Sequence, residues 1–120
     1  MKFISVPIFI LSLAIGLFVV YITAPKAQVI YVYPNPARQI LNYEIRTNFI
    51  PISAEMYVYD SVGDRVYSES LEMNTMREKY QWPLINVFGD MVSRGVYFLR
   101  IKLVEQTRTL KKTMKVVVLN

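Results

Sequence analysis

The chain has 120 residues, of which 14 are Lys or Arg and 9 are Asp or Glu, so its net charge is +5. This length allows one domain at most. The sequence has no cysteine and no histidine, which excludes disulfides, thiolate metal sites and every catalytic or zinc-binding role of histidine. An enzyme would have only carboxylates, tyrosines and lysines to work with. We therefore expect no enzymatic activity, no cofactor, no bound metal and no small-molecule substrate.

The first segment is hydrophobic and free of charge from Phe3 to Ala24, between Lys2 and Lys26. As a helix rising about 1.5 Å per residue it is long enough to cross a bilayer core of about 30 Å. The segment therefore predicts a membrane anchor that contacts lipid. A cleaved signal peptide is the alternative, although its apolar core is usually about 7–15 residues and Pro25 makes the nearby cut positions poor. The flanking charges are nearly symmetrical and do not predict the orientation.

The predicted anchor and its tether end at residue 27. The pattern of residues 28–120 predicts a series of short strands. The segments rich in β-branched and aromatic residues are separated by Pro, Gly, Asn and Asp turn signals, and none has a helical period. The pattern predicts an all-β domain at 28–120, an Ig-like antiparallel β-sandwich of six or seven strands, preceded by one transmembrane helix. The predicted strands are residues 28–33, 40–45, 56–60, 65–71, 80–82, 96–104 and 107–119.

Alternation of apolar and polar residues predicts which side chains form the core. Lys112 falls in the inward phase of the last strand, so we expect a bulge or an edge location there. The predicted core residues are Met56, Val58, Val66, Trp82, Tyr97, Leu99, Ile101, Leu103, Leu110, Met114, Val116 and Val118, with Leu41 or Ile45.

Charge is unevenly distributed within this domain. Residues 28–93 carry five basic and eight acidic residues, whereas residues 94–120 carry seven basic and one acidic. An acidic protein surface and anionic lipid are candidate partners. Nucleic acid is not expected, because no aromatic residues interleaved with these charges and no RNA-binding motif are evident. A solvated edge strand, on which Lys prevents aggregation, is the plainer interpretation. The candidate partner-binding residues are Arg100, Lys102, Arg108, Lys111 and Lys115.

Several turn motifs have a structural interpretation. The corner consists of Tyr33, Pro34, Asn35 and Pro36, in which the prolines fix the backbone.

A second motif pairs Asp60, which can cap a tight turn, with Gly63, which can adopt a positive φ. Asp64 adds a second carboxylate, but two are few for a Ca²⁺ site, so we expect a solvated turn. In the third motif, Gly95 allows a sharp turn before Tyr97 packs inward.

These motifs lie in four stretches: VYPNPARQILNYEI, AEMYVYDSVGDRVYSESL, SRGVYFLRIKL and KKTMKVVVL. In order and spacing they resemble the C-terminal sorting domains of bacterial type IX secretion cargo, and the related Ig-like domain of the flagellar hook-capping protein, over about residues 29–119. The resemblance implies a β-sandwich and, for the sorting domains, recognition by a secretion machine. Such domains follow a cargo protein, whereas here only the hydrophobic segment comes first.

A shorter stretch, GLFVVYITAPKAQVIYVYPNP, resembles the amino-terminal anchor of small membrane proteins of large DNA viruses with internal membranes. The sequence thus leaves three functions open. The favoured prediction is a non-enzymatic, single-pass membrane protein whose β-domain lies outside the cytoplasm and acts as an interaction or assembly subunit of an envelope or surface complex. The alternatives are an exported, secreted protein with a type IX-like sorting domain, and a minor membrane or capsid protein of a virion.

Overall fold

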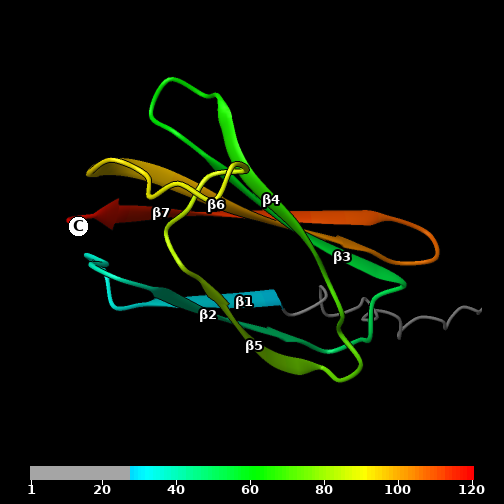
Figure 1. Ribbon diagram of the computed structural model, residues 1–120. Helices are drawn as coiled ribbons and strands as arrows, with labels where there is room; N and C mark the ends of the chain where they lie inside the picture. The colour runs from blue at the N-terminus through cyan, green and yellow to red at the C-terminus, as the bar shows by residue number, and fades with distance from the viewer. Residues whose placement is uncertain (1–27) are drawn as a thin grey trace, which may run out of the picture.

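The computed structural model describes residues 28–120, which form two antiparallel sheets stacked face to face (Figure 1). The prediction of an all-β sandwich of six or seven strands is confirmed, with seven strands in residues 28–120. The strands are β1 Gln28–Tyr33, β2 Leu41–Thr47, β3 Ser53–Tyr59, β4 Arg65–Leu71, β5 Arg77–Trp82, β6 Gly95–Val104 and β7 Thr109–Val118.

Two strands begin three residues earlier than the sequence pattern predicts. β3 begins at Ser53, and β5 begins at Arg77. The added residues are polar or small, but they pair with neighbours: Ser53 lies opposite Val104, and Arg77 lies opposite Arg46. Strand pairing thus overrides their weak intrinsic β propensity.

The predicted transmembrane span from Phe3 to Ala24 lies outside the described residues. Within residues 28–120, no helix is long and apolar enough to cross a membrane.

One sheet has the strand order β1-β2-β5 and the other has the order β4-β3-β6-β7. In constant-type immunoglobulin domains the fourth strand belongs to the sheet of the first, second and fifth. Here β4 pairs with β3 instead, which gives sheets of three and four strands. β6 lies between β3 and β7, and β7 forms an outer edge of the four-stranded sheet (Figure 1).

The core lies between the sheets, where the predicted alternation places it. Nine of the predicted core residues are buried, Leu41 and Ile45 are both buried as well, and Val66, Leu110 and Met114 are half-buried. Trp82 is fully buried; its indole N–H donates to the Ile85 carbonyl at 2.9 Å, and its ring meets Tyr97 edge to face at 6.0 Å. Burial of this large aromatic ring, with its polar atom satisfied, favours a single packing of the two sheets.

The predicted bulge at Lys112 is wrong, whereas the predicted edge location is confirmed. β6 and β7 pair in continuous register, with Lys112 opposite Ile101. Because β7 is an edge strand, the Lys112 side chain reaches solvent without a bulge. The register shift occurs instead on β3, between Val58 and Tyr59.

Candidate partner-binding surface

The outer face of β6 and β7 gathers most of the basic residues that the sequence singles out. The odd-numbered residues of β6 from Tyr97 to Leu103 are buried, so Arg100 and Lys102 point to the outer face. Lys102 lies opposite Lys111, and Lys115 lies opposite Phe98. The four cations therefore share one face of two neighbouring strands.

Two of these four cations are engaged within the domain. The Arg100 guanidinium lies 5.3 Å from the centre of the Tyr59 ring and donates to the Thr113 hydroxyl at 3.2 Å. The Lys102 ammonium lies 3.7 Å from the Glu55 carboxylate. These contacts orient both side chains on the sheet, as cation–π and ion-pair contacts do at partly exposed sites.

The other two cations, Lys111 and Lys115, are exposed. Among residues 28–120, the ion pairs of the four-stranded sheet and its hairpin use Lys102 and Arg108, and none uses Lys111 or Lys115. Like charges on neighbouring strands repel each other unless a counter-charge is supplied. These two lysines are therefore available to an anionic partner.

Arg108 does not lie on this face. β7 begins at Thr109, so Arg108 belongs to the turn between β6 and β7, where its guanidinium Nε pairs with the Glu105 carboxylate at 3.0 Å. The turn is closed by the Glu105 N–H, which donates to the Arg108 carbonyl at 2.8 Å. The sequence pattern treated this residue as part of a strand.

The Tyr33–Pro36 corner, which follows β1, is fastened to β7. Both X-Pro peptide bonds, Tyr33–Pro34 and Asn35–Pro36, are cis. The Asn35 side chain accepts from the Val117 N–H at 2.9 Å and donates to the Lys115 carbonyl at 3.2 Å. A side-chain amide thus takes the place of a neighbouring strand along this part of the edge.

The Asp60 turn connects β3 to β4. One carboxylate oxygen of Asp60 accepts from the N–H groups of Val62 and Asp64, at 3.1 and 2.9 Å, and Gly63 has φ 97°. This oxygen is therefore used by the turn itself, as expected of a capping aspartate. Gly95 opens β6 with φ 154°.

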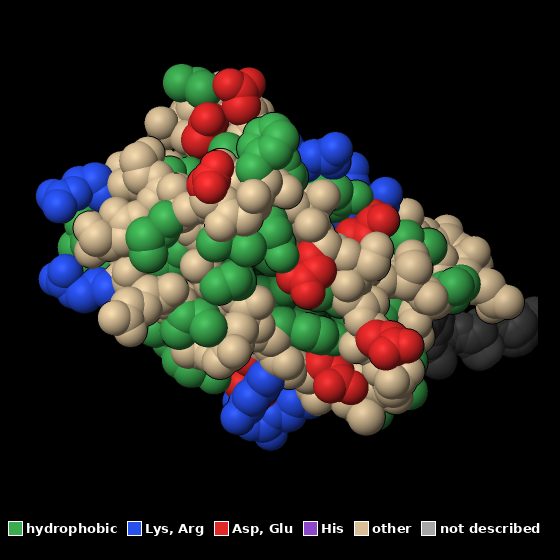
Figure 2. Space-filling view, viewed as in Figure 1, with side chains coloured by type: hydrophobic (Ala, Val, Ile, Leu, Met, Phe, Trp, Pro, Cys, Tyr) green, Lys and Arg blue, Asp and Glu red, His purple; other side chains and the backbone are tan. Residues whose placement is uncertain are grey.

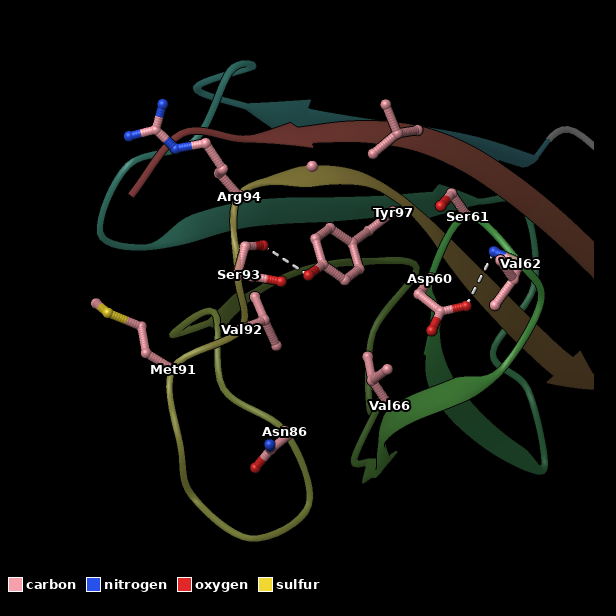
Figure 3. Close-up of a pocket in the computed structure, with 12 residues that line it drawn as sticks. Asp60, Ser61, Val62, Val66, Asn86, Met91, Val92, Ser93, Arg94 and Tyr97 are labelled. Carbon is pink, nitrogen blue, oxygen red and sulfur yellow. Dashed lines mark hydrogen bonds between the residues drawn. The ribbon is translucent and has the colours of Figure 1, made fainter.

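A pocket of about 530 Å³ lies beside this turn (Figure 3). Asp60, Arg94, Gly95 and Tyr97 are among the residues that line it, so the turn motif and the Gly-Val-Tyr motif meet here. The Tyr97 hydroxyl donates to the Ser93 carbonyl at 2.6 Å, as Figure 3 shows. The Tyr97 ring also packs against Trp82. The hydrogen bond and this packing together give Tyr97 a structural role.

The sequence pattern missed a buried carboxylate on the other sheet. Glu44 is only 5% exposed, and its carboxylate lies 3.0 Å from Arg46 Nε and 2.6 Å from Arg77 Nε. Hydrogen bonds from the two arginines lower the pKa of Glu44. In the sequence this cluster is marked only by a Glu that has polar neighbours on the same face of β2. Its second arginine, Arg77, is 33 positions from Glu44 and carries no local signal.

A second polar group on β2, the Tyr43 hydroxyl, is also buried, but unlike Glu44 it has no partner among the described residues. Tyr43 is fully buried between the sheets, and no hydrogen bond to its hydroxyl is found among residues 28–120. Burial raises the pKa of Tyr43 strongly. The Tyr43 ring stacks on Tyr80 at 5.4 Å, so its role is packing.

Charge separates over the surface, as the sequence predicts. Figure 2 shows one face on which acidic side chains lie among apolar ones, while Lys and Arg lie toward its margins. On this face acidic and basic side chains thus occupy different areas, and long-range attraction of a partner would depend on the area it approaches.

Comparison with solved structures supports the fold. Dimeric latent PorU from Porphyromonas gingivalis matches with a TM-score of 0.68 and 20% identity, over 80% of this chain and 10% of that one. PorZ, described as an essential surface component of the type IX secretion system of the same organism, matches with a TM-score of 0.52 and 20% identity, over 76% of this chain and 11% of that one. FlgD from Pseudomonas aeruginosa matches with a TM-score of 0.58 and 14% identity, over 77% and 73%.

The chain thus spans about a tenth of the length of PorU and PorZ, so the likeness is to a small part of each. No curated protein matches the sequence. The profile of the secretion system C-terminal sorting domain matches residues 31–118, from β1 to the last residue of β7. The resemblance carried by the four motifs is confirmed, and the chain belongs to the family of secretion system C-terminal sorting domains.

Proposed function

We propose that residues 28–120 are the sorting domain of an exported protein and are recognised by a type IX secretion machine. The observation that carries the proposal is the family match, which covers nearly the whole sandwich, at residues 31–118. The likeness to domains of PorU and PorZ supports it at the level of the fold. This function replaces the anchored assembly subunit as the favoured one.

The role is non-enzymatic. Without histidine and cysteine the chain lacks the usual general base and thiol nucleophile. The Asp60 carboxylate oxygen that faces its turn is occupied by two backbone N–H groups. The partners of the domain are proteins, and we expect it to bind neither nucleic acid nor a small-molecule substrate.

Recognition uses the basic outer face of β6 and β7. Arg100 and Lys102 are held in place by contacts within the domain, and Lys111 and Lys115 are exposed beside them. Arg108 lies in the adjoining turn, where it is paired with Glu105, and is not part of this face. A protein with an acidic surface complements this face and would be steered toward it.

In this proposal the hydrophobic segment from Phe3 to Ala24 first directs the chain across the inner membrane and is then removed. One observation favours retention instead: the segment is free of charge over a length that spans a bilayer. A retained segment would make the protein a single-pass membrane protein of the envelope. The two possibilities give different final locations and different masses.

The test inserts a reporter protein after Ala27 in the full chain, in a bacterium with a type IX secretion system. A sorting domain sends the reporter to the cell surface or the medium in the parental strain, and leaves it inside the outer membrane in a strain without the translocon. A matched chain that ends before β6 lacks two strands of the four-stranded sheet and is the negative control. Equal distribution of the reporter in both strains would refute the sorting role.

A further inference from the structure

β7 is an outer strand of the four-stranded sheet, and only its second half is covered. The Asn35 side chain binds Lys115 and Val117, as described above. Next to it, the Ala37 N–H donates to the Val117 carbonyl at 2.7 Å, and the Leu119 N–H donates to the Ala37 carbonyl at 2.8 Å. The segment around Asn35 therefore closes the edge from residue 115 onward.

The first half of the edge is open. Backbone groups in a strand point alternately to either side, and Val117 points away from β6. Thr109, Lys111 and Thr113 share this phase, so their N–H and C=O groups also point away from β6. Within residues 28–120 no partner is found for these groups. Such an edge can accept a further strand.

The side chains along the open edge define which strand fits. Lys111 and Lys115 are exposed on the outer face, and Lys112 is exposed in the inward phase. Leu110 and Met114, also in the inward phase, are half-buried. A strand with carboxylates on the outer face and apolar side chains on the inner face would complement both rows.

We propose that the open edge of β7, residues 109–113, binds an extended acidic segment of a partner protein by adding it to the sheet as a fifth strand. Backbone hydrogen bonds supply affinity in strand addition, and the side-chain rows supply specificity. The inference deepens the proposed sorting role and rests on it for the identity of the partner. Strand addition itself is tested by a binding measurement that involves no secretion.

The probe is a fluorescent ten-residue peptide that alternates Glu with Val, titrated with the full chain in mild detergent and followed by anisotropy. Thr113→Pro removes an outward N–H that β6 does not use, so the sheet is expected to stay intact. We expect it to weaken binding by about tenfold or more, because strand addition depends on this hydrogen-bond row. Thr113→Val keeps the N–H and is the matched control, expected to bind within about twofold of the original chain.

The same step is tested from the peptide side, without relying on the folding of a variant. In an antiparallel fifth strand, a Glu residue placed opposite Lys111 directs its own N–H group toward β7. A peptide N-methylated at every Glu keeps its charge but cannot form the ladder, and we expect it to lose binding. A Lys–Val peptide is the charge control and is expected not to bind.

Two results would overturn the proposal. One is the absence of binding by the Glu–Val peptide at about 0.02 M salt, where attraction to exposed lysines is strongest. The other is equal binding by the N-methylated peptide, which would mean that charge alone captures it. Peptide binding without export of the reporter would support strand addition and refute the sorting role. Export of the reporter without peptide binding would support the sorting role and refute strand addition.

Discussion

Replacing Asn35 by Ala removes the side-chain amide that joins the amino-terminal corner to β7. Two hydrogen bonds are lost, from the Val117 N–H at 2.9 Å and to the Lys115 carbonyl at 3.2 Å. A hydrogen bond of this kind contributes about 0.5–1.5 kcal/mol net, and both lie at an exposed edge, so we expect a loss of about 1–2 kcal/mol in the free energy of unfolding. In a domain of this size each kcal/mol lowers Tm by about 4–8 °C.

The loss is measured by urea unfolding of the full chain in mild detergent, followed by the fluorescence of Trp82. This residue is the single tryptophan and is fully buried, so its emission reports on the packing of the two sheets. Asn35→Asp keeps an acceptor for Val117 but loses the donor to Lys115, and should have an effect of the same sign. Asn48→Ala, at an exposed asparagine in the loop after β2, is the control. If Asn35→Ala and Asn48→Ala unfold at the same urea concentration, the edge clamp does not stabilise the fold.

Three other variants test the core and the charges. The lowered pKa of Glu44 means that this carboxylate stabilises the fold above its ordinary pKa of 4.5 and ceases to do so as the pH falls through the lowered value. Glu44→Gln should therefore make Tm fall less steeply on acidification. An unchanged dependence of Tm on pH would contradict this. Leu99→Ala, at a fully buried position, should cost about 2–5 kcal/mol in urea unfolding, and an equal cost for exposed Val62→Ala would argue against the assigned core. Exchange of Lys111 and Lys115 for Glu should change the free energy of unfolding by less than about 0.5 kcal/mol yet reduce export of the reporter, and undiminished export would remove the basic face from recognition.

Much of the core follows from local pattern, because buried and more exposed side chains alternate along strands such as β6. Leu99 and Ile101 can be assigned to the core from β6 alone, and both are fully buried. The start of β3 cannot be found in this way, because Ser53 and its neighbours become strand only through pairing with β6 and β4.

The candidate site is predictable only in part. Alternation places Arg100, Lys102 and Lys111 on one face, but it does not show that β7 is half covered, because the covering residue, Asn35, is 80 positions from its partner Lys115. The cluster of Glu44 with Arg46 and Arg77 cannot be predicted for the same reason, since Arg77 comes from another strand. Contacts between distant segments depend on the register of the sheets, and a single strand carries no signal for them.

The most direct test of the sorting role is the location and intact mass of the unmodified chain, in a bacterium with a type IX secretion system and in a strain that lacks the translocon. The account predicts a chain at the surface or in the medium of the first strain, shortened by its hydrophobic segment, and its retention inside the second. A chain of the full 14.0 kDa that stays with the membranes of both strains would contradict it.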